Sequence, residues 1–202
     1  KTGTITKGQP EVTDLLSLGA REDKQILRLA AIAEKNSEHP LGVTIYEKGK
    51  AEYGNLPDPD QFEAIPGHGI RAVVDQQEIY IGTRKLMMEN GIALDTVEAA
   101  VVELENQGKT AMLMSIDNQV EAIIAVADTL KENSKEAIAE LQQMGIEVYM
   151  ITGDNRRTAA AIAEQVGIAN VLAEVLPEHK AEEVEKLKKQ GAIVAMVGDG
   201  IN

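Results

Sequence analysis

Three aspartates in the second half of the chain could do chemistry together. Asp128, Asp154 and Asp199 each lie at or just beyond the end of an apolar run, and glycines flank the last two. In an open parallel sheet the carboxyl ends of the strands form the edge where ligands bind, so acids there predict a site for a cation or a phosphate. The alternative is that each Asp only caps the helix that follows it.

The elements that would position these acids alternate along the chain from residue 120 onward. Apolar, β-rich runs take turns with helical patterns, which predicts a parallel α/β sheet. The predicted strands are residues 120–127, 147–151, 171–173 and 192–197. The predicted helices begin at Asn133 or Ser134, at Thr158 and near Glu178, and the first two end at glycines.

The middle of the chain has a different pattern. Short strands are predicted at residues 62–65, 70–74, 78–81 and 111–116, and helices at 23–35, after Pro40, at 85–90 and at 95–107. Strands that meet mostly through hairpins beside helices predict an α+β module. We therefore expect an inserted domain at residues 11–120 within a discontinuous α/β domain at residues 1–10 and 121–202, with short hinges near residues 8–12 and 119–127.

Composition limits the function classes. The chain has 202 residues, enough for a sizeable core, and 33 Asp+Glu against 20 Lys+Arg give a net charge of −13. An acidic chain without a basic stretch repels a phosphate backbone, so no nucleic-acid partner is expected. The absence of Cys excludes disulfides and thiolate sites. With no apolar run near 18 residues, these 202 residues are expected to be soluble.

Three motifs together resemble those of P-type cation-transporting ATPases. They are Lys-Thr-Gly-Thr at residues 1–4, Thr-Gly-Asp-Asn at 152–155 and Gly-Asp-Gly-Ile-Asn at 198–202, in the family's order. The resemblance implies a haloacid-dehalogenase-like phosphorylation domain with a Rossmann-type parallel sheet. In that family an Asp before the first motif is the phosphorylated nucleophile. It would precede Lys1, so we expect the chain to be a piece of a longer polypeptide.

The resemblance also implies roles for individual residues. Phosphoryl transfer to a carboxylate needs a hard cation with oxygen ligands and donors to the phosphate oxygens. Asp199, helped by a backbone carbonyl near Thr2, is the expected Mg²⁺ ligand. Lys180 matches a phosphate-neutralising lysine, although a solvated lysine at a helix start is the alternative. The full catalytic set is Lys1, Thr2, Thr4, Thr152, Gly153, Asp154, Lys180 and Asn202.

The motif Ser-Glu-His-Pro-Leu at residues 37–41 resembles that of heavy-metal, copper-type transporters. The resemblance implies that Glu34 hydrogen-bonds the adenine amino group and that His39 lies beside the purine ring or the phosphates. It also implies that Gly67 and Gly69 let the backbone approach the nucleotide. The alternative for His39 is a structural role, in which the ring makes its hydrogen bonds within the protein. Thr83 stands where the pattern has Asn, which predicts a weaker contact there.

These observations predict the ATP-binding and phosphorylation headpiece of a transporter that exports a heavy metal, most simply Cu⁺. ATP and Mg²⁺ are the expected cofactors, and transmembrane and actuator domains of the same chain are the expected partners. The transported ion would bind elsewhere, and the headpiece would lie at the cytoplasmic face of a membrane. Without the nucleophilic Asp, these 202 residues should bind nucleotide but form no phosphoenzyme.

Two other functions remain open on the sequence alone. The first is a soluble haloacid-dehalogenase-like phosphatase with an inserted cap domain. Such phosphatases usually carry a second acid two residues after the nucleophile, and Thr2 occupies that position, which favours the transporter. The second is a pure nucleotide-binding or regulatory module.

Overall fold

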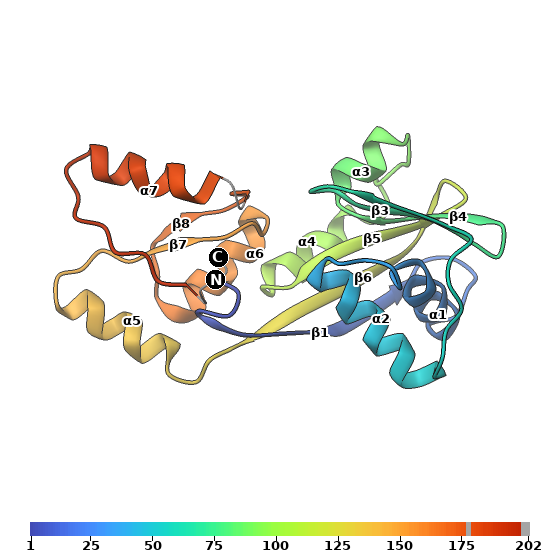
Figure 1. Cartoon of the computed structure of the whole chain (residues 1–202), viewed down its shortest axis with the longest axis horizontal. Coiled ribbons are helices and arrows are strands. Elements are labelled where there is room, and N and C mark those ends of the chain that lie inside the picture. The colour runs from blue at the N-terminus through green and yellow to red at the C-terminus, as the bar shows by residue number, and fades with distance from the viewer. Residues whose placement is uncertain (177–178, 199–202) are drawn as a thin grey trace. The chain divides into compact units, whose positions relative to one another are not determined.

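The computed structural model describes residues 1–176 and 179–198 (Figure 1). The chain forms two compact units. Unit 1 comprises residues 1–9, 105–108 and 128–202, and unit 2 comprises residues 10–104 and 109–127. Residues 121–127, which the sequence assigned to the α/β domain, belong to unit 2 because they pair with a neighbouring antiparallel strand.

Unit 2 is built on a six-stranded sheet of order β1-β6-β5-β4-β3-β2, and the pairs from β2 to β6 are antiparallel. Non-glycine residues with positive φ make the tight turns after β3 and β5, as hairpins with matching twist require. The strands are β1 (Thr6–Ser17), β2 (Gln61–Ile65), β3 (Gly69–Val74), β4 (Gln77–Gly82), β5 (Thr110–Ile116) and β6 (Gln119–Leu130).

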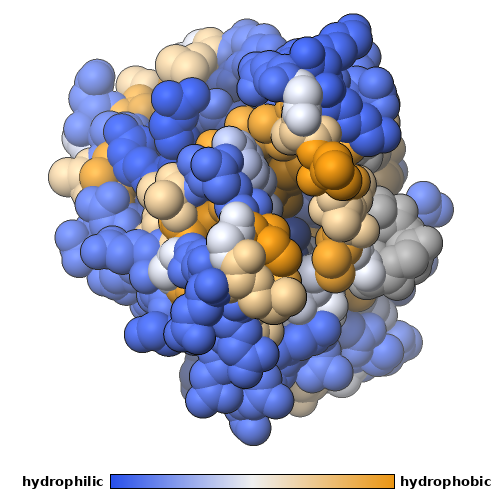
Figure 2. Space-filling view, turned by 90° about the vertical axis from the view of Figure 1, so that its left-hand side faces the viewer, coloured by the Kyte–Doolittle hydropathy of each residue, from blue (hydrophilic) through white to orange (hydrophobic). Residues whose placement is uncertain are grey.

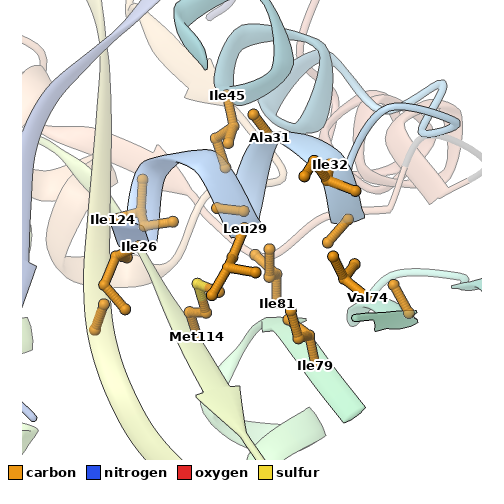
Figure 3. Close-up of a cluster of buried hydrophobic side chains, with 14 of the residues drawn as sticks. Ile26, Leu29, Ala31, Ile32, Ile45, Val74, Ile79, Ile81, Met114 and Ile124 are labelled. Atoms are coloured by element: carbon orange, nitrogen blue, oxygen red, sulfur yellow. The ribbon is translucent and has the colours of Figure 1, made fainter. Parts of the chain in front are cut away.

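Helices cover both faces of this sheet. On one face, Ile26, Leu29 and Ile32 of α1 (Asp23–Ala33) and Ile45 of α2 (Pro40–Tyr53) pack against Ile79, Ile81, Met114 and other strand residues (Figure 3). On the other face, α3 (Arg84–Glu89) and α4 (Glu98–Asn106) enclose a second core around Tyr80, Leu113 and Ile123. The α+β character predicted for the middle of the chain is confirmed.

The predicted hinges near residues 8–12 and 119–127 coincide with the places where the chain passes between the two units, at residues 9/10 and 127/128, but both segments lie within long strands. Residues 8–12 belong to β1, the edge strand of the sheet, and residues 119–127 belong to β6. Gly8 and Pro10 are not typical of a strand, so the sequence did not indicate β1. An edge strand tolerates proline and glycine that a central strand does not.

Unit 1 contains a parallel pair, β7 (Tyr149–Ile151) and β8 (Asn170–Leu172), with helices α5 (Ser134–Gln143), α6 (Arg156–Val166) and α7 (Lys180–Lys189). Met150 and side chains of α5 and α6 form its core. Gly167, in the left-handed conformation, ends α6 as the sequence predicts.

The predicted strand at residues 192–197 is wrong, because this segment forms no strand. Ile193 and Val197, which a core strand would bury, are exposed. The exposed apolar side chains of unit 1 include Met144, Ile146, Leu176 and Met196 as well. Figure 2 shows such hydrophobic surface among hydrophilic residues.

The predicted convergence of three aspartates at one parallel edge is therefore not observed. Asp128 lies within the antiparallel strand β6, and Asp199 lies outside the described residues. Asp154 alone of the three follows a strand of the parallel pair that the structure describes, β7.

Candidate functional site

A polar cluster lies just after β7 in unit 1. The Lys1 Nζ atom lies 2.6 Å from Asp154 Oδ2, and the Lys1 side chain is only 6% exposed. The Thr152 hydroxyl donates to the same oxygen at 2.7 Å, and the Asp154 amide donates back to Thr152 Oγ1 at 3.2 Å. The Lys1 cation therefore meets a hydroxyl and a carboxylate from a motif far away in the sequence, as the motifs predict.

The backbone around this cluster is fixed by hydrogen bonds. The Thr152 amide donates to Leu172 O and the Val175 amide to Thr152 O, which joins the segment after β7 to the end of β8. Asn155 then caps α6 by accepting from the Thr158 amide at 3.0 Å. Gly153, between them, has room: a Cβ there would meet only Val175 O, at 3.5 Å. The cluster thus sits on a rigid turn with open space beside it.

Other predicted catalytic residues lie near the beginning of the chain and at the start of α7. Thr2 is exposed and Thr4 is half-buried, in a turn where the Lys1 carbonyl accepts from backbone amides. Lys180 is the first residue of α7 and is half-buried. Asp199 and Asn202 lie outside the described residues.

The described residues alone do not form a magnesium site. Over residues 1–176 and 179–198, no group of three or more His, Asp or Glu side chains is placed to hold a metal ion. The Asp154 Oδ2 atom is already in contact with the Lys1 ammonium and the Thr152 hydroxyl. Asp199, the predicted ligand, is not among the described residues.

Asp128 holds the beginning of β1 in place. Its Oδ2 atom accepts from the Thr6 hydroxyl and, at 3.1 Å, from the Gly8 amide, while Oδ1 accepts from the Gln9 amide at 3.1 Å. Lys131 adds a bond from its Nζ atom to Gly3 O at 2.6 Å. The role of Asp128 in this structure is thus to clamp a strand, which is neither of the roles weighed from the sequence.

We expect Asp128→Ala to destabilise unit 1 by about 2 kcal/mol, because two amides and a hydroxyl lose a charged acceptor but regain water where they are exposed. Chemical denaturation of the 202-residue chain would measure this loss. Asp128→Asn is the matched control, since it keeps an acceptor oxygen and should recover part of the stability. Equal stability of wild type and Asp128→Ala would show that the clamp contributes nothing.

Glu34, in unit 2, is a buried acid at the end of α1. Its residue is 4% exposed, and its Oε2 atom has no hydrogen-bond partner among the described residues. Burial raises the pKa of this carboxyl to about 7, and a hydrogen bond from the Ser37 hydroxyl offsets only part of that rise. A buried acid with an unused oxygen is unusual in a folded protein and points to a ligand.

His39 begins the helix that follows. Its Nδ1 atom accepts from the Leu41 amide at 3.3 Å and caps α2, so the neutral ring carries its proton on Nε2. The His39 amide in turn donates to Ser37 Oγ at 3.4 Å. Partial loss of hydration lowers the pKa of His39, although the residue as a whole remains exposed. At neutral pH the ring therefore presents an N–H donor.

Gly42, in the first turn of α2, leaves the space that these groups occupy. A Cβ at this position would lie 2.3 Å from Glu34 Oε2 and 2.4 Å from Ser37 Oγ. Sequence reasoning assigned no role to Gly42 or to the Ser37 hydroxyl. A glycine inside a helix costs stability relative to alanine. Its presence in the helix predicted after Pro40 could therefore have indicated that a side chain at position 42 would be too large.

The other predicted nucleotide residues lie at the β2–β3 turn and at the start of α3. The Thr83 amide donates to His68 O at 2.8 Å, and the Thr83 hydroxyl caps α3 by accepting from the Leu86 amide. Gly67 has a φ of +74° and open space around it, whereas a Cβ at Gly69 would lie 2.1 Å from Ile81 O. The close approach that requires Gly69 is therefore within the sheet, and nucleotide contacts of Gly67, Gly69 and Thr83 stay predictions.

The whole chain, residues 1–202, matches the family model of haloacid dehalogenase-like hydrolases. The chain therefore belongs to this family, as its motifs predict. Its whole length also resembles a part of heavy-metal P-type ATPases. It is 50% identical over 202 residues to a copper-exporting P-type ATPase of Bacillus subtilis (strain 168) and over 203 residues to one of Staphylococcus aureus (strain JH9). Each match covers 100% of this chain but only 25% of the relative.

Solved structures agree with this assignment. A zinc-transporting PIB-type ATPase in its E2.Pi state is 36% identical with a TM-score of 0.68, and the match covers 98% of this chain and 32% of that one. The catalytic CPx-ATPase domain CopB-B, at 24% identity and a TM-score of 0.70, covers 100% of this chain and 69% of its own, and supports the fold alone. The predicted fold class and family are confirmed.

Proposed function

We propose that this chain is the ATP-binding and phosphorylation headpiece of a P-type ATPase that exports a heavy metal, with Cu⁺ as the first candidate for the exported ion. The observation that carries the proposal is the buried Glu34 carboxyl, whose Oε2 lacks a partner among the described residues; Ser37 links it to His39, whose ring supplies an N–H donor. This site lies in a chain that is 50% identical to copper-exporting ATPases throughout its length. We propose that this chain takes part in the copper export for which these relatives are named.

In this proposal each unit has one task. Unit 2 binds the adenine end of ATP at Glu34 and His39. In unit 1, Lys1 and Thr152 donate to phosphate oxygens, and the ion pair with Asp154 holds the Lys1 ammonium in place before phosphate arrives. The unused oxygen of Glu34 fits a hydrogen-bonding base, so ATP fits the residues present. Mg²⁺, when bound, would neutralise phosphate charge, with Asp199 as the proposed ligand.

The rest of the transport cycle lies in other domains of the proposed whole protein. An aspartyl phosphate would couple ATP hydrolysis to export through transmembrane and actuator domains, with the transported ion bound there. In residues 1–176 and 179–198, the structure has no helix with the length and apolar character needed to cross a bilayer. We place the headpiece at the cytoplasmic face of the membrane.

The test is a calorimetric titration of the 202-residue chain with ATP, ADP, AMP and GTP. We expect adenine nucleotides to bind with a Kd between about 1 μM and 1 mM. We expect His39→Ala to weaken this binding about tenfold, because a donor near the ligand is lost. His179→Ala, on an exposed histidine at the start of α7, is the matched control. Failure of every adenine nucleotide to bind would instead favour a phosphatase with a cap domain.

A further inference from the structure

The Glu34 carboxyl is buried without a counter-charge. No described ion pair includes it, and the charged groups near it are directed elsewhere or neutral. Lys35 Nζ donates to Leu56 O at 2.7 Å and pairs with Asp58 at 3.1 Å. Glu38 is exposed, and the lowered pKa of His39 keeps that ring neutral near pH 7. From α2, the residue that meets Glu34 Oε2 is Gly42, which has no side chain.

A carboxylate in such surroundings is expensive to keep ionised. Removing an ion from water costs several kcal/mol unless a cation or several donors replace the water, and among the described residues the Ser37 hydroxyl is the one donor that acts on the carboxyl. The acid form needs far less compensation. Burial accordingly brings the pKa of Glu34 to about 7, so both forms are accessible near neutral pH.

The two forms of the carboxyl differ in what they offer a base. Adenine presents an amino donor at N6 and an acceptor at N1 on the same edge. A carboxylic acid presents one O–H donor and one C=O acceptor, whereas a carboxylate presents acceptors only and would set one of them against the lone pair of N1. The acid form is therefore complementary to adenine at both positions.

We propose that Glu34 binds adenine as a neutral carboxylic acid, accepting a hydrogen bond from the N6 amino group and donating one to N1. This inference rests on the proposed function, since it assumes that adenine occupies the site. No bond forms or breaks in the base. Where Glu34 is ionised in the free protein, one proton from the solvent joins its carboxylate on binding.

Proton uptake is the direct readout. ADP is titrated calorimetrically at about pH 8, in two buffers with different ionisation enthalpies, into wild type and Glu34→Gln. We expect wild type to take up close to one proton more than Glu34→Gln. The phosphates of ADP contribute equally to both proteins, so the difference isolates residue 34. Wild-type affinity should also fall by up to about tenfold per pH unit above pH 7, and the variant's should not.

Two variants separate pairing from packing. Glu34→Gln presents the same acceptor and donor as the acid, so at about pH 6 it should lose affinity only about threefold. Glu34→Leu fills similar space without polar atoms and should lose at least about twentyfold. Thermal unfolding of both variants confirms that they are folded.

Other outcomes are equally distinct. Proton release on binding, no difference in uptake between wild type and Glu34→Gln, or a Glu34→Gln variant as weak as Glu34→Leu would overturn the inference while leaving nucleotide binding in place. Wild type that binds no adenine nucleotide at any pH would overturn the proposed function and this inference together.

Discussion

Replacing Gly69 by alanine should lower the free energy of unfolding of unit 2 by about 3 kcal/mol or more. The added Cβ would lie 2.1 Å from Ile81 O and 2.6 Å from the Gly82 Cα atom, both backbone atoms of the paired strand β4. Gly69 and Gly82 form the terminal pair of the β3–β4 ladder, and their backbones cannot move apart without breaking that pairing. The φ of +142° at Gly69 adds strain for any residue with a side chain. Denaturant unfolding of the 202-residue chain would measure the loss.

Gly67→Ala is the matched control for this experiment. Gly67 lies two residues earlier, in the turn before β3, with a φ of +74° and nothing within 4 Å of its added Cβ. Its cost should be that of the left-handed conformation alone, about 1 kcal/mol. Equal losses for the two variants would show that the contact between β3 and β4 does not decide the need for Gly69.

Local pattern was sufficient for the helices of this fold. The apolar spacing of α1 places Ile26 and its neighbours on one buried face, and Pro40 starts α2 where the sequence predicts it. Asn155 and Gly167 bound α6 as cap residues do. Each of these signals acts within one or two turns of chain, so a single sequence carries it completely.

Sheet membership could not be predicted in the same way. The apolar run in β6 reads equally well as a buried parallel strand, but its partner is the preceding hairpin strand β5. Residues 192–197 have the composition of a core strand, yet without a paired neighbour among the described residues they stay irregular and exposed. Pairing depends on residues distant in sequence, which periodicity does not report.

In the candidate site, too, local motifs were predictable from the sequence and contacts between distant residues were not. Motifs indicated Lys1, Thr152 and Asp154, which the structure brings together, and Glu34 with His39, which share contacts with Ser37. The space left by Gly42 and the clamp made by Asp128 depend on three-dimensional contacts. From the sequence, Asp128 was expected to cap a helix or to bind a ligand. In the structure its carboxylate instead accepts hydrogen bonds from backbone amides of β1.

Glu34 should make the stability of unit 2 fall as pH rises from about 4.5 to about 7. The folded state holds the proton more tightly than the unfolded chain, because burial raises the pKa from 4.5 to about 7. Between these values the folded protein binds more protons, so the free energy of unfolding declines with pH. The stabilisation is fully present below the unfolded pKa, and above pH 7 a total of about 3 kcal/mol has been lost.

Denaturant unfolding of wild type and Glu34→Gln from about pH 4 to about pH 8 would isolate this term. The variant has no titrating group at residue 34, while every other group is shared, so the difference in unfolding free energy between the two proteins reports Glu34 alone. We expect wild type to lose stability relative to Glu34→Gln as the pH rises. Ser37→Ala should move the midpoint of that loss upward, because the hydroxyl that favours the carboxylate is gone. A difference that does not change with pH would mean that Glu34 ionises as easily in the folded protein as in the unfolded chain, and it would contradict the raised pKa.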